Sequence, residues 1–209
     1  MDNNLLQVTG NPVEFSDAKL MFSEIMRNVT RNGVDELLAF LERTDFYTAP
    51  SSTKFHNAFK HGLLYHSLNV YHVLVDLVKR YAPGEYSDET VAIVGLLHDL
   101  CKVNFYKLEP RNRKIDGEWR SVLEYVVDDK LPLGHGEKSV IVLQRFFELN
   151  GFEALAINWH MGSFDARASN YVGTSQLAQA LGSCKLVTLL HTADLIASNV
   201  YEGVGPENK

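Results

Sequence analysis

Apolar residues recur every three or four positions in two N-terminal segments, residues 18–30 and 34–44. This spacing puts them on one face of a helix, so the pattern predicts two amphipathic helices. Ser16 or Asp17 can cap the first helix, because a short polar side chain accepts hydrogen bonds from the exposed backbone N–H groups of the first turn. Gly33 is a typical stop signal between the two helices.

A longer segment, residues 60–81, is apolar on most of its sides, which predicts a central helix that is buried all round. Residues 44–59, which precede it, contain Pro and Ser and are expected to be irregular. Ser87 or Asp88 can cap the next segment, residues 91–102. There a short apolar run is compatible with a buried strand or a buried helix. We favour a helix, because the neighbouring segments are helical and no second strand-like run is available to pair with it.

Residues 104–127 show a different pattern, in which two aromatic and β-branched stretches flank Asp116-Gly117. An Asp-Gly pair is a strong signal for the turn of a β-hairpin. The glycine-containing segment at residues 162–173 predicts a loop. Three more apolar segments predict helices, at residues 136–149, 152–161 and 185–200. Together these patterns predict an all-α protein with one small β-hairpin insertion around residues 104–127, folded as a single domain over residues 1–209.

The composition, with 45% hydrophobic and 22% charged residues in 209, is that of an ordinary globular protein. The net charge of −6 argues against binding to duplex DNA, which requires a basic face. No apolar run approaches the roughly 20 residues that cross a membrane, and the N-terminus lacks the features of a secretory leader. The two cysteines, Cys101 and Cys184, lie in apolar segments, so we expect reduced, buried thiols in a cytoplasmic protein.

Polar side chains interrupt the apolar run GLLHDLCKV, residues 95–103. His98, Asp99 and Lys102 stand together there, and burying a charge without a partner costs several kcal/mol. A bound cation is the simplest compensation. Asp194, within the apolar segment LLHTADLIAS, is another charged residue that requires a partner. Imidazoles combined with carboxylates suit Zn, Fe, Mn, Co or Ni better than Ca or Mg. The sequence therefore predicts a transition-metal site on a helical scaffold.

Each histidine of the apolar segments, taken singly, is more typical of a hydrogen-bonded core residue than of a metal ligand. Their order along the chain is more specific. The successive contexts GLLYHSLNV, LLHDLCKV, GHGEKSV, WHM and ADLIAS resemble the HD-domain superfamily of metal-dependent phosphohydrolases, over about residues 55–200. The metal ligands that the resemblance implies are His66, His98, Asp99, His135, His160 and Asp194.

The resemblance implies an all-α fold around one or two divalent ions, with Mn, Fe, Ni, Co or Zn expected and Mg a further option. The first ion is held in such proteins by the positions that correspond to His66, His98, Asp99 and Asp194. Asp99 then bridges to a second ion, held by His135 and His160. The metal-binding core extends over about residues 55–200, and the N-terminal helices at residues 16–44 are expected to pack on it.

The implied activity is hydrolysis of a phosphate mono- or diester, in a nucleotide or a small phosphorylated metabolite, by water that the metal activates. Asp99 belongs to this catalytic set as the bridging ligand, and Lys102 is expected to neutralise charge on the phosphoryl oxygens. His56 and His61 are the candidates for protonating the leaving oxygen. The stretch FHNAFKHGLLYHS that contains both also resembles the exoribonuclease branch, in which glycine stands at the position of His61.

The candidate substrate contacts are Lys102, Arg167, Tyr171 and His191. His191 lies three residues before Asp194, on the same helical face, so it can either support a ligand or face the substrate. The basic residues of the hairpin fit a flap over a phosphate, and they fit a solvated hairpin equally well. A short single-stranded nucleic acid is a further substrate compatible with them, and a homodimer is compatible with the sequence.

Two other functions stay open on the sequence alone. A six-ligand HD site also resembles the mixed-valent di-iron oxygenases, which use O₂ to cleave C–C or C–P bonds. A stable di-iron centre and oxygen consumption would identify that reaction. The other function is a module that senses a nucleotide without hydrolysing it. The intact ligand set and Lys102 argue against such a module, because binding alone does not require them.

Overall fold

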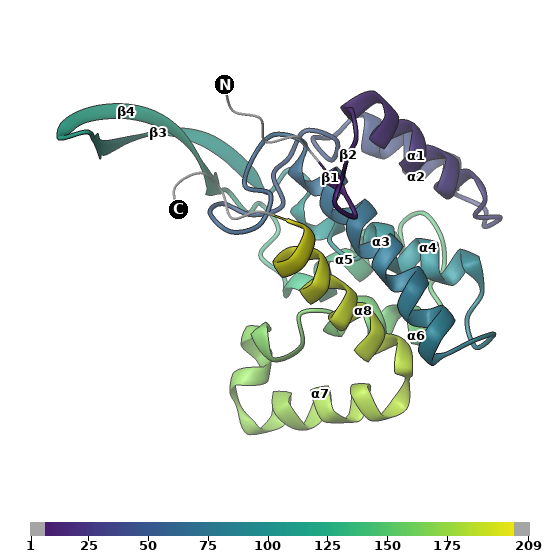
Figure 1. The fold of residues 1–209 in the computed structure, drawn as a ribbon. Helices are drawn as coiled ribbons and strands as arrows, with labels where there is room; N and C mark the ends of the chain where they lie inside the picture. The colour runs from purple at the N-terminus through teal and green to yellow at the C-terminus, as the bar shows by residue number, and fades with distance from the viewer. Residues whose placement is uncertain (1–6, 203–209) are drawn as a thin grey trace.

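Eight α-helices form the body of residues 7–202, the part of the chain that this computed structural model describes (Figure 1). The prediction of a mainly helical fold is confirmed. The helices are α1 (Phe15–Arg27), α2 (Val34–Glu42), α3 (Gly62–Tyr81), α4 (Asp88–Leu97), α5 (His135–Leu143), α6 (Gly151–Trp159), α7 (Tyr171–Ser183) and α8 (Lys185–Ile196).

Helix α3 lies at the centre of the fold, as its apolar sequence predicts, and α1, α4 and α8 pack against it. Leu64, Leu68 and Leu74 of α3 are fully buried. Helix α4 comes close because residue 95 is a glycine: a Cβ at Gly95 would lie only 2.9 Å from the Cα of Tyr71 on α3. This close packing brings the C-terminal end of α4 next to α3.

Helices α1 and α2 pack through the apolar faces that the sequence predicts. The fully buried side chains on these faces are Phe22, Met26, Leu37 and Leu41. The predicted boundaries are wrong in two details. Helix α1 follows Glu14 without a side-chain cap, so neither Ser16 nor Asp17 caps it. Gly33 precedes α2 with a φ of +98°, a left-handed conformation that glycine adopts without strain, and it does not end α1.

The β-hairpin consists of β3 (Tyr106–Ile115) and β4 (Glu118–Val127) and projects from the helical body (Figure 1). Asp116 and Gly117 form its two-residue turn, with φ values of 53° and 87°. Paired positive values of φ characterise the type I′ turn, whose twist matches that of the two strands. The predicted hairpin is therefore present with its predicted turn.

A short hairpin and a helix occur where the sequence predicts neither. Strands β1 (Gln7–Val8) and β2 (Asn11–Pro12) form a second, very short hairpin. Helix α7 begins inside the predicted loop at residues 162–173 and continues beyond it. Its sequence has no charged residue and many small ones, so its helical periodicity is weak. Asn170 marks its start, because the side chain accepts a hydrogen bond from the backbone N–H of Gly173 at 3.0 Å.

Helices α4 and α5 end well before their predicted boundaries. Helix α4 ends at Leu97, so the prediction of a helix over residues 91–102 is too long, and a short 3-10 turn, Leu100–Lys102, follows. Helix α5 ends at Leu143, although the pattern predicts a helix over residues 136–149. After α4 the chain continues into a buried turn, whereas the turn after α5, residues 144–146, is largely exposed. Hydrophobicity therefore does not mark where helical hydrogen bonding stops.

Among residues 7–202, no single helix has the length and apolar character needed to cross a membrane. The segments Tyr171–Ser183 and Lys185–Tyr201 meet that requirement only as a pair, which is bent by 106°. The second segment contributes Leu186, Val187 and Leu190 to the buried core.

A partly buried ion pair joins the loop between α1 and α2 to α6. Arg31 donates through Nη1 to Oε2 of Glu153 at 2.7 Å and through Nη2 to Oε1 at 2.5 Å. Glu153 is fully buried, and it also accepts hydrogen bonds from Oγ1 of Thr90 and the backbone N–H of Asn150. Because this carboxylate is removed from water, it depends on Arg31 for a compensating charge.

Replacing Arg31 with leucine is expected to lower the free energy of unfolding by about 3 kcal/mol, because the buried carboxylate of Glu153 loses its cation. Urea denaturation followed by circular dichroism measures the change. Lys19→Ala is the control, since it removes a more exposed ion pair with Glu42 and should cost less than about 1 kcal/mol. An Arg31 variant as stable as this control would contradict the role of the pair.

Candidate metal centre

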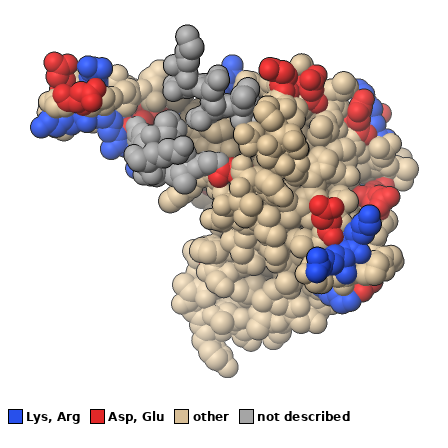
Figure 2. Space-filling view, in the orientation of Figure 1, with Lys and Arg blue, Asp and Glu red and all other residues tan. Residues whose placement is uncertain are grey.

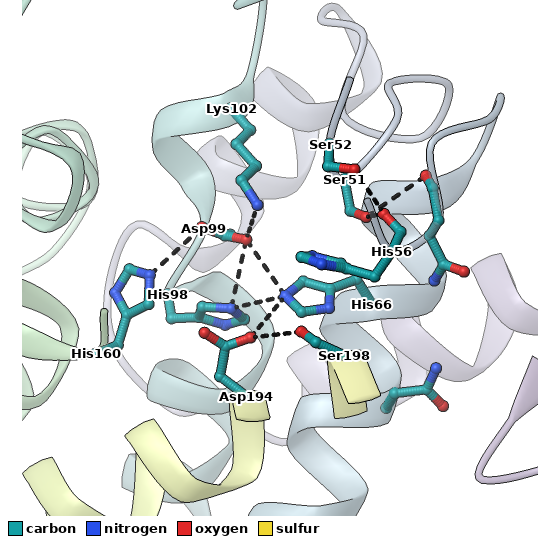
Figure 3. Close-up of polar contacts among 12 residues, drawn as sticks. Ser51, Ser52, His56, His66, His98, Asp99, Lys102, His160, Asp194 and Ser198 are labelled. Atoms are coloured by element: carbon teal, nitrogen blue, oxygen red, sulfur yellow. Dashed lines mark hydrogen bonds and ion pairs between the residues drawn. The ribbon is translucent and has the colours of Figure 1, made fainter. Parts of the chain in front are cut away.

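Imidazole and carboxylate side chains from three parts of the fold meet at His66, in the buried first half of α3 (Figure 3). Nε2 of His66 lies 3.2 Å from Nε2 of His98, 3.3 Å from Oδ2 of Asp99 and 3.3 Å from Oδ1 of Asp194. His98 and Asp99 follow the end of α4, and Asp194 belongs to α8. These four side chains are close enough to surround one ion.

The carboxylate of Asp99 faces two sets of imidazoles. Its Oδ2 lies on the side of His66 and is 3.5 Å from Nε2 of His98. Its Oδ1 lies 2.7 Å from Nε2 of His135 and 3.5 Å from Nε2 of His160. This arrangement, with one oxygen directed to each side, suits a carboxylate that bridges two ions. The fold thus brings all six predicted ligands together.

Helix ends determine which nitrogen of two imidazoles faces the cluster. His98 follows α4 and donates from Nδ1 to the carbonyl oxygen of Gly95 at 2.9 Å. His160 follows α6 and donates from Nδ1 to the carbonyl oxygen of Ile157 at 2.7 Å. A carbonyl oxygen can only accept, so Nδ1 carries the proton and Nε2 presents its lone pair to the cluster. The last carbonyl groups of a helix lack partners within the helix and are available for such bonds.

The residues fit a divalent transition metal. Nε2 of His160 is buried and makes no hydrogen bond with any residue in the described part of the chain. Native structures rarely leave a buried polar atom in that state, and a coordinated ion would satisfy it. Four imidazoles and two carboxylates also form a donor set that suits Zn, Fe, Mn, Co and Ni.

The family of the chain follows from its sequence together with this cluster. The sequence model of the HD domain matches residues 63–198, which is well over half of the chain. The chain belongs to the HD-domain superfamily of metal-dependent phosphohydrolases. The expectation from the sequence is therefore confirmed at the level of the family. No curated protein and no solved structure matched the chain.

Glu202 supports this HD-domain site from behind His66, and sequence analysis did not predict it. It follows a π-helical turn, Ala197–Tyr201, that continues from α8. Its Oε1 and Oε2 lie 3.1 and 3.0 Å from Nδ1 of His66, and Oε1 accepts a hydrogen bond from Nδ2 of Asn69 at 3.0 Å. The carboxylate thereby binds the Nδ1 proton and directs Nε2 to the cluster. No periodic pattern marks Glu202, because it lies in a short polar stretch near the C-terminus.

The charged groups of the site stabilise one another, which shifts their pKa values toward the charged forms. Burial raises the pKa of Asp99, but the ammonium group of Lys102, whose Nζ is 2.6 Å from Oδ2, and the surrounding imidazoles together outweigh this and hold the pKa well below 3.8. Burial lowers the pKa of Lys102, but Asp99 raises it above 10.5. For His66, burial again opposes the charged form, and the surrounding carboxylates, Glu202 first, raise the pKa well above 6.5. This is an environment that attracts cations.

His56 and His61, the two candidate proton donors, have different surroundings. The ring centroid of His56 lies 4.8 Å from that of His66, and its buried Nε2 makes no hydrogen bond among the described residues. Burial, together with the charges of His66 and Lys102, lowers the pKa of His56 to about 4. His61 instead donates from Nδ1 to the carbonyl oxygen of Tyr47 at 2.6 Å, and its ring packs against α1. Of the two, His56 is the one at the cluster.

The predicted substrate contacts His191 and Arg167 are engaged by other groups of the protein, and Tyr171 is exposed. His191 donates from Nδ1 to the carbonyl oxygen of His160 at 2.6 Å and so supports the backbone of a ligand. Arg167 donates from Nη2 to Oδ2 of Asp165 at 2.5 Å and is also held by neighbouring polar groups. Tyr171 is 89% exposed at the start of α7. Their roles in substrate binding stay predictions.

Glu202→Gln is expected to weaken metal binding by about tenfold or more, because the neutral amide holds the Nδ1 proton of His66 less strongly. Competition between the protein and a chelator for Zn²⁺ measures the affinity. Glu118→Gln, at an exposed position of β4, is the control and should not change it. Equal affinities in the two variants would show that Glu202 does not support the site.

Proposed function

We propose that this HD-domain protein hydrolyses a phosphate mono- or diester of a nucleotide or of a small phosphorylated metabolite. The observation that carries the proposal is the Asp99 carboxylate, with one oxygen toward each histidine pair and the ammonium group of Lys102 2.6 Å from Oδ2. Ligands for divalent ions beside a buried fixed cation suit a phosphoryl group, which spreads negative charge over several oxygens.

Two overlapping sets of residues would hold the ions. One set consists of His66, His98, Asp99 and Asp194, and the other of Asp99, His135 and His160. When bound, divalent ions supply Lewis-acid polarisation of the phosphoryl group and make the attacking water more acidic. The protein contributes two carboxylate charges and imidazole lone pairs whose directions are set before the substrate arrives.

Lys102 would bind the phosphoryl oxygens. Its side chain extends from the 3-10 turn after α4 into the space above Asp99 (Figure 3). It stays charged despite being only 8% exposed, because Asp99 stabilises the ammonium group. In this poorly hydrated position its attraction for a phosphoryl oxygen is stronger than that of a lysine at the surface.

His56 is better placed than His61 to contact the leaving oxygen. The hydroxyl groups of Ser51 and Ser52 both donate to the backbone carbonyl oxygen of His56, at 2.6 and 2.9 Å, and so hold the loop in position. The ring then lies next to His66, and its buried Nε2 has no hydrogen-bond partner among the described residues (Figure 3). We assign His56 a hydrogen bond to the leaving group.

The charge distribution of the hairpin favours a small substrate over a short nucleic-acid strand. Arg111 pairs with Glu109 at 3.2 Å, and Arg113 donates from Nη2 to Glu124 at 2.8 Å. Basic and acidic side chains are interspersed near the hairpin tip (Figure 2). A groove for single-stranded nucleic acid instead combines an excess of positive charge with stacking surfaces. The proposal is therefore a nucleotide or a small phosphorylated metabolite.

The same six ligands are compatible with the di-iron oxygenase alternative. The position of Lys102 favours hydrolysis, because activation of O₂ has no requirement for a buried ammonium group 2.6 Å from a ligand oxygen. Lys102 and the full set of six ligands also argue against a module that senses a nucleotide without turnover, since binding alone does not need them.

Asp99→Ala and His98→Ala are expected to lose bound metal and phosphate-ester hydrolysis together, while far-ultraviolet circular dichroism stays nearly unchanged. Elemental analysis gives the metal content, and a screen of phosphate mono- and diesters with added Mn²⁺, Ni²⁺ or Co²⁺ gives the activity. His72→Ala, on α3 but hydrogen-bonded to Met21, is the control. Full activity of the Asp99 variant would contradict the proposal, and oxygen consumption without phosphate release would favour the oxygenase.

His56→Ala is expected to lower kcat by about a hundredfold without changing the metal content, because it removes the contact with the leaving oxygen. His61→Gly should keep nearly full kcat, since the φ of +75° at this position suits glycine and the side chain points to the N-terminal helices. Steady-state kinetics on one phosphate ester compare the two variants. A larger loss of kcat in the His61 variant would reverse the assignment.

A further inference from the structure

A thiol group lies at the second half of the metal centre. Cys101, in the 3-10 turn that follows Asp99, is 3% exposed and forms no disulfide. Its Sγ lies 3.5 Å from each ring nitrogen of His135 and 4.0 Å from Oδ1 of Asp99. These three donor groups lie within 4.8 Å of one another, close enough to share one ion.

The backbone holds this thiol in place. The N–H of Cys101 donates to Oγ of Ser139 at 3.0 Å, which ties the turn to α5. His135 is the first residue of the same helix. The turn is closed by a hydrogen bond from the N–H of Lys102 to the carbonyl oxygen of Asp99 at 3.0 Å. The sulfur atom therefore has a defined position relative to both neighbouring ligands.

His160 provides an independent indication of an ion on this side of Asp99. Its Nε2 is buried, makes no hydrogen bond with any described residue, and lies 3.5 Å from the same Oδ1 of Asp99. Its ring centroid is 5.1 Å from that of His135. Since Nδ1 donates to a carbonyl group, Nε2 presents a lone pair that only a cation or a hydrogen-bond donor can satisfy.

We propose that Cys101 is a thiolate ligand of the second ion, beside Asp99, His135 and His160. The inference rests on the metal centre of the proposed function and specifies which metal ion this centre prefers. One sulfur, two imidazole nitrogens and one carboxylate oxygen form a four-donor set typical of Zn²⁺. A thiolate favours Zn²⁺, Fe²⁺ or Co²⁺ over Mg²⁺ and Mn²⁺. The thiol releases its proton to solvent as the sulfur lone pair forms the bond to the metal.

Cobalt spectroscopy tests this inference on the full-length protein. Co²⁺ bound to a thiolate shows a sulfur-to-metal charge-transfer band in the near ultraviolet, whereas Co²⁺ bound only to nitrogen and oxygen does not. The chain has two cysteines, and the other, Cys184, lies at the start of α8 with its Sγ 3.6 Å from the hydroxyl oxygen of Tyr86. Cys184→Ser is therefore the matched control, a second buried thiol outside the ligand cluster.

The band is expected in the wild type and in Cys184→Ser, and absent in Cys101→Ser. The preference for Zn²⁺ over Mn²⁺, measured by competition, should fall by about tenfold or more in Cys101→Ser only. A band observed in the Cys184→Ser protein can be assigned to Cys101 without the Cys101→Ser variant, because Cys101 is then the one remaining thiol. The assignment thus stays testable even where Cys101→Ser does not fold.

Cobalt that binds without this band, or with a band that disappears in Cys184→Ser, overturns the inference. A wild type that binds no cobalt overturns both the inference and the metal centre. A protein that shows the band but hydrolyses no phosphate ester retains Cys101 as a ligand, while the proposed function fails. The two conclusions are therefore separable.

Discussion

The candidate metal centre depends on one buried carboxylate. Asp99 is 2% exposed, and a carboxylate so far removed from water stays ionised only where positive charge and hydrogen-bond donors replace the solvent. Lys102 supplies the nearest charge, and imidazoles approach both oxygens. The other ligands are arranged around this group, so the position of Asp99 after α4 determines where the whole site can form.

Helix termini determine which imidazole nitrogens face the site. His98 and His160 each follow the last residue of a helix and use a carbonyl group of that helix to bind the Nδ1 proton. Glu202 does the same for His66, from the chain beyond α8. All three imidazoles therefore present Nε2 before any ion arrives, which lowers the cost of assembling the coordination sphere. A helical bundle is well suited to such a site, because its helix ends offer unpaired carbonyl groups.

Packing elsewhere in the fold keeps these helix ends together. The close contact at Gly95 sets α4 against α3, and the ion pair of Arg31 with the buried Glu153 joins the N-terminal helices to α6. The projecting hairpin and the uncharged helix α7 contribute none of the six ligands. The ligands thus come from the packed elements and the turns that end them.

The sequence by itself determined the helical fold, the hairpin with its Asp-Gly turn, and the set of polar residues that had to find partners in an apolar environment. These features depend on local periodicity, on turn chemistry and on the cost of burying charge. Only the tertiary structure decided that α4 stops at Leu97, that His56 and not His61 lies at the cluster, and that Glu202 and Cys101 adjoin the ligands. The reason is physical. Distances between side chains of different elements depend on how those elements pack, and a local sequence pattern does not contain that information.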